Sequence, residues 1–384
     1  MVAKSGIHKN LSGFDMERVS NARRGARYNM RNAPAGVLQS TPRSQIRAAA
    51  AKVACARLPR HGAAANNAPG RDRQREEPLY TDAIEILDPR FKKLVFGNVH
   101  LDKLFTGCRW AEGPAYFAAG KYLVWSDIPN DRVMRFDETD GSVSVFLQPA
   151  LNHNGHTVDR EGRLIACEHR GRCVSRFEHD GTRTVLASHF QKKRLNSPND
   201  AVVKSDGSIW FTDPTYGIDS EYEGDAAPSE IGASNVYRID PASGDVAAVV
   251  TDLVKPNGLA FTPDEASLYV ADTGFTHDET CTPKIRRYPV NKDGRSVGSG
   301  ALFTECKIGL FDGFRIDTKG NLWTSAGDGV HCYAPDGTLI GKIKVPEVVA
   351  NVCFGGPKRT RLYICGTTSL YSIYLNAQGA RWPG

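Results

Sequence analysis

The segments NGHTVDREGRLIACEH (154–169), NDAVVKSDGSIWFTDP (199–214), NGLAFTPDEASLYVADT (257–273) and DGFRIDTKGNLWTSAGDG (312–329) are four copies of one pattern. Each copy begins with a polar pair, continues as a short strand, turns at Asp or Gly and ends in a second strand. Two shorter matches begin at Glu112 and at Asn351. The six starting positions lie about 42, 45, 58, 55 and 39 residues apart, close to the roughly 40 to 50 residues of a propeller blade. The sequence therefore predicts an all-β, six-bladed β-propeller.

A second repeat supports the same blade boundaries. The third strand of several blades reads RVMRFD, CVSRFE or NVYRID and is followed by a turn such as DETDG, EHDG or DPASG. Helical character is expected only as a single turn near residues 82–87. Two stretches interrupt the period, Tyr216 to Ala233 and Thr273 to Pro283. Loops of this length are expected to be lids or binding loops, although surface excursions without a role remain an alternative.

The repeat also predicts the domain organisation. A chain of 384 residues would suit two or three domains by length alone, but an array of repeats can form one domain, here residues 76–384. Residues 1–75 are rich in Arg and Ala and include AAAAK and GAAANNAPG, so a disordered tail is predicted. This tail resembles an organellar targeting segment, and a misassigned start codon would give a similar extension. Since no secretory core is present, a cytoplasmic location is expected, with an organelle as the alternative.

Charge and composition exclude several classes of partner. The net charge is +6, but residues 1–75 hold 15 basic and 3 acidic residues, which leaves 34 basic and 40 acidic residues for the predicted domain. A mildly acidic domain argues against a nucleic-acid partner, and no run of 18 apolar residues predicts a membrane span. Nine cysteines without a CxxC pair argue against a disulfide framework or a structural zinc site. Cys167, Cys353 and Cys365 are expected to be buried strand residues. The oligomeric state is not predicted.

The six repeated polar residues should meet around one channel, because the innermost strand of each propeller blade lines the axis. They form a set of two carboxylates and four amides, here called the ring: Glu112, Asn154, Asn199, Asn257, Asp312 and Asn351. Oxygen ligands of this kind suit Ca²⁺, Mg²⁺ or Mn²⁺ better than copper or a structural zinc. Alternatively, Asn-Gly and Asp-Gly only supply turns. Glu112 is no turn former, so a channel centred on a metal ion is favoured.

The chain resembles the senescence marker protein/gluconolactonase/luciferin-regenerating enzyme family over about residues 80–375. The resemblance lies in WAEGPAYF (110–117), RLNSPNDAVVKSDGSIWFTDPTYG (194–217), PNGLAFTPDEASLYVADT (256–273), DGFRIDTKGNLW (312–323) and NVCFGG (351–356). It implies a six-bladed propeller that binds one divalent cation and hydrolyses sugar lactones. Ca²⁺ is favoured, with Zn²⁺, Mg²⁺ and Mn²⁺ as alternatives.

The resemblance also implies roles for individual residues. It assigns the metal ligands to Glu112, Asn199, Asn257 and Asp312, with Asn199 also orienting the substrate and Asp312 also acting as the catalytic base. Some relatives carry an arginine two residues before this asparagine, whereas the nearest arginine here, Arg194, is five residues ahead.

The second blade resembles the bacterial gluconolactonase branch of that family through NHNGHTVD (152–159) and CEHRGRCVSR (167–176). Its candidate pocket residues are Asn154, His156, Glu168, His169 and Arg170. A histidine in a β-protein is otherwise a hydrogen-bonded structural residue.

A metal ion could polarise a lactone carbonyl and lower the pKa of a bound water. Asp312 is the expected general base, with His156 or His169 in reserve. No GxSxG elbow supports a serine hydrolase. Two rival functions remain open: a metal-dependent arylesterase or organophosphate hydrolase, and a non-catalytic calcium-binding propeller. A strictosidine-synthase-like enzyme is disfavoured because such propellers are not built around this ring.

Overall fold

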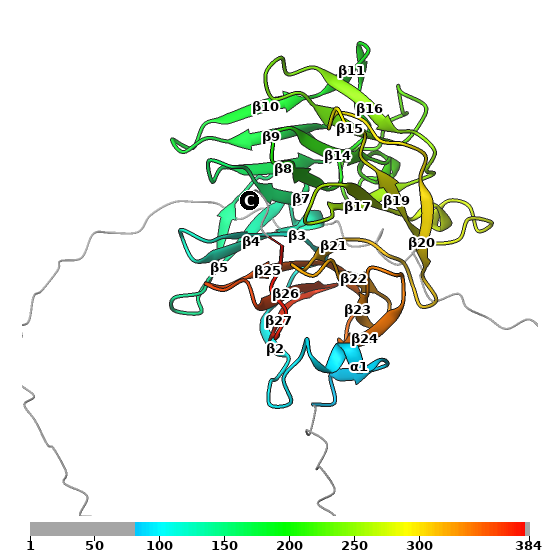
Figure 1. Ribbon diagram of the computed structural model, residues 1–384. Helices are drawn as coiled ribbons and strands as arrows, with labels where there is room; N and C mark the ends of the chain where they lie inside the picture. Colours follow the sequence, from blue (N-terminus) through cyan, green and yellow to red (C-terminus); the bar gives the residue numbers. More distant parts are fainter. Residues whose placement is uncertain (1–80, 381–384) are drawn as a thin grey trace, which may run out of the picture. The chain divides into compact units, whose positions relative to one another are not determined.

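A computed structural model of the chain describes residues 81–380, and it confirms a propeller of six antiparallel sheets (Figure 1). The predicted tail, residues 1–75, lies outside the described residues. The first four blades follow the chain from the innermost strand outward. The first blade holds β3 (Ala111–Phe117), β4 (Tyr122–Asp127), β5 (Arg132–Asp137) and β6 (Val143–Leu147), and the second holds β7 (His153–Val158), β8 (Leu164–Glu168), β9 (Cys173–Phe177) and β10 (Arg183–Ala187). The third blade holds β13 (Ala201–Val203), β14 (Ile209–Asp213), β15 (Asn235–Ile239) and β16 (Val246–Val250), and the fourth holds β17 (Pro256–Phe261), β18 (Ser267–Asp272), β19 (Lys284–Pro289) and β20 (Ala301–Glu305).

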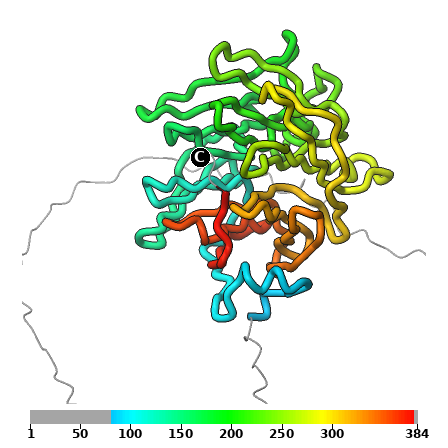
Figure 2. The backbone as a smooth tube through the Cα atoms, in the orientation of Figure 1, coloured from blue at the N-terminus to red at the C-terminus, as the bar shows by residue number. Residues whose placement is uncertain are grey.

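The last two blades take their outermost strands from the beginning of the described chain. The fifth blade holds β21 (Phe314–Ile316), β22 (Leu322–Ala326), β23 (Gly329–Tyr333), β24 (Leu339–Lys344) and β1 (Ile84–Ile86). The sixth holds β25 (Val349–Gly355), β26 (Arg361–Gly366), β27 (Ser369–Tyr374) and β2 (Asp102–Thr106). Figures 1 and 2 show β2, in cyan, beside the red β27. This pairing closes the ring of blades and covers the edge that β27 would otherwise expose.

The expectation of a helical turn at residues 82–87 is wrong. Residues 84–86 instead form β1, which pairs with β24. The turn comes later, as α1 (Pro89–Lys92), because the Asp88 side chain accepts a hydrogen bond from the Arg90 amide at 2.8 Å and Pro89 has a backbone angle suited to a first helical position. The other short elements are η2 (Ile128–Asn130), the hairpin β11 (His189–Phe190) with β12 (Lys193–Arg194), α2 (Tyr216–Asp219) and η3 (Gly274–Thr276).

The hydrophobic core lies between neighbouring blades. Trp210 of the third blade meets Phe261 of the fourth edge to face, with ring centroids 5.2 Å apart, and Trp323 of the fifth meets Phe354 of the sixth in the same way at 6.0 Å. Complete burial of one such side chain contributes roughly 1.5 to 3 kcal/mol. The blades are therefore held together by side chains that neighbouring sheets share.

The cysteines are part of these cores, as expected. Cys167, Cys353 and Cys365 are buried in β8, β25 and β26. All eight cysteines of the described chain are free thiols. Within residues 81–380, no helix has the length and apolar character needed to cross a membrane.

The innermost strands approach one another so closely that glycine is required beside the ring. The Gly155 amide donates to the carbonyl of Asn199 at 2.7 Å, and the Gly258 amide donates to the carbonyl of Asp312 at 3.1 Å. A Cβ atom at position 155 would lie 2.4 Å from the Asn199 oxygen, and one at position 258 would lie 2.2 Å from the Asp312 oxygen. These glycines serve the contact between blades rather than a turn.

We predict that closure by β2 contributes strongly to stability. A chain that begins at Gly107 lacks β1 and β2, so it should melt about 10 °C or more below a chain that begins at Glu76, at roughly 2 to 4 °C per kcal/mol. The chain that begins at Glu76 should match the full-length protein in melting temperature. Circular dichroism melts of the three proteins measure both effects, and equal melting temperatures for the two shortened chains would contradict the role of β2.

Candidate functional site

The structure places the six ring residues at the starts of the six innermost strands. Glu112, Asn154, Asn257 and Asn351 lie within β3, β7, β17 and β25, whereas Asn199 and Asp312 each precede their strand by two residues. Five of the six side chains are buried, and Asp312 is partly exposed. Asp312 is therefore the member of the ring that solvent reaches most readily.

Three aspartates at the ends of second strands hold the chain segments that lead into the ring. Asp127 accepts a hydrogen bond from the Arg109 amide at 2.8 Å, Asp213 from the Asn196 amide at 2.9 Å and Asp272 from the Lys255 amide at 3.0 Å. Each bond fixes the backbone two or three residues before a ring residue. The recurring strand ends WSD, FTD and VAD are a sequence signal for these aspartates.

The channel holds charged groups in addition to the two carboxylates and four amides of the ring. Asp200, directly after Asn199, adds a third carboxylate, which is buried as that of Glu112 is. Arg315 of β21 is paired with it, at 3.4 Å from Nη1 to Oδ2. The carboxyl groups of Glu112, Asp200 and Asp312 thus outnumber the guanidinium of Arg315 by two, and the charge of Glu223 in the inserted loop also acts on Asp312.

This excess of buried negative charge alters the pKa values of the carboxyl groups. Burial, with a further contribution from the charge of Asp200, raises the pKa of Glu112 to about 8. Burial and then the charge of Glu112 raise the pKa of Asp312 well above its ordinary value. Carboxyl groups in such surroundings either keep a proton or gain from a cation among them.

The amides of the ring do not all have the same task. Asn351 donates from Nδ2 to Glu112 Oε2 at 2.9 Å, and its Oδ1 accepts from the Val352 amide at 2.8 Å. Because both ends of this amide are engaged, Asn351 positions Glu112. By contrast, Oδ1 of Asn154 is buried without a hydrogen-bond partner.

The donor set fits a divalent cation with hard oxygen ligands. No cluster of three or more His, Cys, Asp or Glu side chains with the geometry of a metal site occurs in residues 81–380, but the predicted ligands include two asparagines. An excess of two negative charges in a buried channel would be balanced by one divalent ion. Glu112, Asn199, Asn257 and Asp312 are the residues that could hold it.

His156 lies in a chain of buried hydrogen bonds. Its Nδ1 is 2.8 Å from the carbonyl of Gly113, and its Nε2 is 3.1 Å from Nδ1 of His153. Burial lowers the pKa of His156 to about 3, so the imidazole of this residue is neutral. With both nitrogens engaged by the protein, His156 is placed to support β3 rather than to accept a proton from water.

Glu168 is a buried structural group in the second blade. Its carboxylate accepts from Arg183 at 2.7 and 2.6 Å, and one oxygen lies 3.5 Å from Nε2 of His153. The structure therefore places Glu168 within the blade rather than at the pocket wall.

His169 and Arg170 do lie at the ring end of the channel. Nε2 of His169 is 3.2 Å from Nδ2 of Asn154. Arg170 pairs with Asp131 at 3.0 Å and with Asp225 at 3.1 Å, and its side chain is partly exposed. Arg194, by contrast, lies in β12 and donates to the carbonyl of Gly171 at 3.4 Å.

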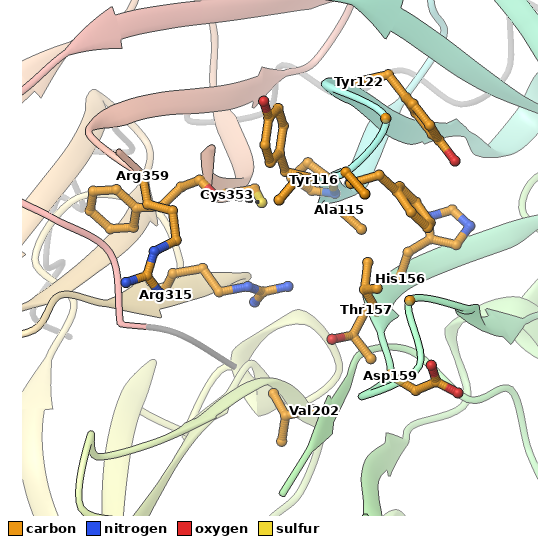
Figure 3. A pocket seen from close by; sticks show the side chains of 18 of the residues that line it. Ala115, Tyr116, Tyr122, His156, Thr157, Asp159, Val202, Arg315, Cys353 and Arg359 are labelled. Carbon is orange, nitrogen blue, oxygen red and sulfur yellow. Dashed lines mark hydrogen bonds between the residues drawn. The ribbon is translucent and has the colours of Figure 1, made fainter. Parts of the chain in front are cut away.

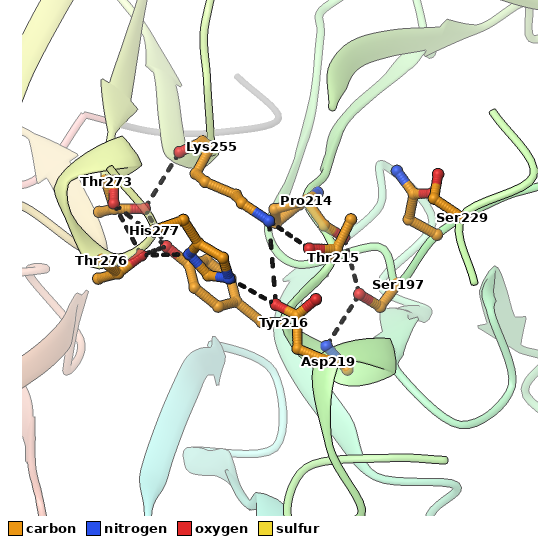
Figure 4. Close-up of polar contacts among 12 residues, drawn as sticks. Ser197, Pro214, Thr215, Tyr216, Asp219, Ser229, Lys255, Thr273, Thr276 and His277 are labelled. Atoms are coloured by element: carbon orange, nitrogen blue, oxygen red, sulfur yellow. Dashed lines mark hydrogen bonds and ion pairs between the residues drawn. The ribbon is translucent and has the colours of Figure 1, made fainter. Parts of the chain in front are cut away.

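The two stretches that interrupt the repeat are joined to each other at the ring end of the channel (Figure 4). The Tyr216 hydroxyl lies 2.6 Å from the Thr273 hydroxyl and 2.9 Å from that of Thr276. His277 Nε2 is 2.8 Å from Asp219. These contacts hold α2 and η3 together.

A cavity of about 530 Å³ lies at the opposite end of the channel (Figure 3). Its lining includes residues three positions beyond ring residues along the innermost strands: Ala115, Thr157, Val202, Ala260 and Arg315. None of the three ring-end carboxylates lines it, so the candidate site is assigned to the ring end on the chemistry of its side chains rather than on this cavity.

Comparison with known proteins supports the motif-based resemblance. Residues 110–368 match the SMP-30/gluconolactonase/LRE-like region. A gluconolactonase from Zymomonas mobilis is 30% identical over 308 residues, which cover 74% of this chain and 84% of that protein. A pentonolactonase from Haloferax volcanii is 32% identical over 267 residues, which cover 67% and 82%. The solved structure of a gluconolactonase from Xanthomonas campestris has a TM-score of 0.72 at 36% identity and covers 77% of this chain and 95% of that one.

We predict that the affinity for a divalent cation rises with pH. Since the pKa of Glu112 is about 8 in the cation-free protein, the cation must displace a proton below that pH. The apparent Kd should therefore increase about tenfold for each pH unit below 8, as for release of one proton. Isothermal titration calorimetry in buffers of different ionisation enthalpy counts the released protons. Glu112→Gln should bind more weakly and release fewer protons; a Kd that does not change with pH would contradict the prediction.

Proposed function

The chain belongs to the SMP-30/gluconolactonase/LRE-like family, and we propose that it hydrolyses sugar lactones at the ring end of its channel, with one bound divalent cation. Relatives at 30 to 36% identity are named gluconolactonase or pentonolactonase. The proposal therefore takes cyclic esters of polyhydroxy acids as the substrate class.

One observation carries the proposal: the carboxyl groups of Glu112, Asp200 and Asp312 lie close enough in the channel to influence one another's pKa, and Arg315 is paired with Asp200 alone among them. A cation there would be held by Glu112, Asn199, Asn257 and Asp312. Carboxylate and amide oxygens favour Ca²⁺ among the common ions, with Mg²⁺, Mn²⁺ and Zn²⁺ as alternatives. A bound divalent ion would polarise the lactone carbonyl and make a bound water more acidic.

Asp312 is the residue best placed to take the proton from the attacking water. Its side chain is the partly exposed member of the ring, so water can reach it. Its pKa is raised by burial and by the charge of Glu112, which makes it a stronger base than an ordinary aspartate, although a bound cation would reduce this effect. The proton on Asp312 is then available to the ester oxygen of the lactone, which leaves as the lactone opens.

The other channel residues bind and orient the substrate. Asn199 begins the third blade directly beside the ring carboxylates, and Asn154 brings an amide from the second. Arg170 at the rim supplies a partly exposed guanidinium. The joined loops at Tyr216 and Thr273 shield this end of the channel from bulk water, which strengthens polar contacts to the substrate.

The proposal is tested with a panel of aldonolactones and aryl esters. Protein freed of metal by chelation is assayed in a pH-stat with Ca²⁺, Mg²⁺, Mn²⁺ or Zn²⁺ added singly. We expect turnover of five- and six-membered sugar lactones that depends on the added ion. Preference for aryl esters would favour an arylesterase, and lack of turnover with every ion would favour a binding protein.

We predict that Asp312 contributes both as a ligand and as a base. Asp312→Asn removes a charge, so the cation should bind more weakly; it also removes the proton acceptor, so kcat should fall about 10²- to 10⁴-fold even when the cation is saturating. Lactonase kcat is measured at cation concentrations far above the Kd of the variant itself. His156→Ala is the matched comparison and should retain more activity. Recovery of wild-type kcat by Asp312→Asn at saturating cation would reduce Asp312 to a ligand.

A further inference from the structure

The insertion of the third blade covers His169 of the second blade. A Cβ atom at Gly217 of α2 would lie 2.4 Å from Cβ and 2.5 Å from Cγ of His169, so the helical turn rests directly on this side chain. Ser197 holds the turn in place, since its hydroxyl accepts from the Gly217 amide at 2.9 Å and donates to the carbonyl of Pro214 at 2.7 Å. His169 is completely buried as a result.

The same insertion brings a carboxylate near Nδ1 of His169, the imidazole nitrogen that does not contact Asn154. Oε2 of Glu223 lies 3.7 Å from Nδ1 of His169, which is within ion-pair range but too long for a hydrogen bond, and Nδ1 has no hydrogen-bond partner among the described residues. On the other side of the imidazole, Nε2 lies 3.2 Å from Nδ2 of Asn154. Glu223, His169 and Asn154 thus form a line that runs from the inserted loop to the ring.

The position of one proton on His169 decides how Asn154 faces the channel. Burial lowers the pKa of His169 to about 4, so the imidazole is neutral and carries a single N–H. A carboxylate beside Nδ1 favours the tautomer with the proton on Nδ1, and Nε2 is then an acceptor. The Asn154 amide must therefore turn its NH₂ group toward His169, which directs its carbonyl oxygen away from it.

The unpartnered atom of Asn154 agrees with this orientation. Oδ1 of Asn154 is buried and has no hydrogen-bond partner in the protein, and a buried acceptor of this kind is expected to find a ligand. With the opposite tautomer of His169, the amide would turn and present its NH₂ group instead.

We propose that Glu223 is a positioning residue that holds the His169 proton on Nδ1 and thereby presents the Asn154 carbonyl oxygen to a hydroxyl group of the substrate. The inference rests on the proposed lactonase function, because the ligand of this acceptor is a polyhydroxy lactone. The inserted loop in this way takes part in substrate recognition without touching the reacting carbonyl, and substrates with a hydroxyl at the matching position are favoured.

The tautomer can be measured without any substrate. Nitrogen-15 NMR of protein labelled at histidine distinguishes Nδ1–H from Nε2–H, and His169→Asn identifies the His169 signals by their loss. The spectra are taken well above the pKa of about 7 that burial gives Glu223, so that its carboxylate is ionised. We expect Nδ1–H in the wild type, a shift toward Nε2–H in Glu223→Ala, and a smaller shift in Glu223→Gln, because glutamine keeps the negative end of an amide dipole near Nδ1 although it loses the charge.

Kinetics supply the second measurement. Loss of one hydrogen bond to the substrate should raise KM for sugar lactones about 5- to 10-fold in Glu223→Ala and leave kcat nearly unchanged. Glu223→Gln should restore most of the affinity. The control is Asp225→Ala, which removes a carboxylate from the same loop. Because Arg170, its ion-pair partner, keeps Asp131, the wild-type tautomer and KM should remain.

The outcomes separate this inference from the proposed function. A wild-type proton on Nε2, or a tautomer that Glu223→Ala does not change, would overturn the inference whatever the activity. If KM rose as much in Asp225→Ala as in Glu223→Ala, the inference would also be overturned, since the rise would reflect a general loosening of the loop. The expected tautomers in a protein that turns over no lactone would uphold the relay from Glu223 to Asn154 and refute the proposed function.

Discussion

The close approach of six innermost strands around one axis is the constraint on which this structure depends. Glycine at positions 155 and 258 allows neighbouring backbones to bond directly, at 2.7 Å and 3.1 Å. The residue before each glycine then has its side chain at the channel. Packing between blades, with its shared aromatic cores, supplies the stability that keeps polar groups in this position. A substitution that widens the strand contact would therefore disturb the ring and the core together.

The charge of the channel follows from that geometry. Asp200 occupies the position where four other blades have glycine, so its carboxylate joins Glu112 and Asp312 in the channel. Arg315 offsets part of the repulsion through its contact with Asp200. Burial, with a smaller contribution from the remaining repulsion, raises the pKa of Glu112 and Asp312. A fold held by strong blade cores can tolerate this cost, and a cation would relieve it.

The spacing of the polar pairs was enough to predict the blades and the six ring positions, because both follow from a period along the chain. Contacts between blades do not recur at a fixed interval along the chain, so the sequence pattern does not predict them. Arg315 lies three residues after Asp312 in a strand whose sequence does not mark this arginine as a channel residue. Its pairing with Asp200 depends on which side of the channel each side chain faces. The local sequence does not predict residues 84–86 as a strand, because their partner, β24, lies more than 250 residues away in sequence. The strand-end aspartates recurred visibly, but their bonds to preceding loops became clear only in three dimensions.

The insertion after β14 shows how one blade can influence the pocket residues of another. Its helical turn rests on His169 of the second blade and is joined to η3 of the fourth. A change in the length or sequence of this loop would alter the surroundings of His169 while the ring carboxylates kept their places. Selection of substrate and the chemistry of hydrolysis can therefore vary separately in this architecture. Loops that join blades at the ring end are consequently where differences in lactone preference should arise, since the innermost strands are fixed by their mutual packing.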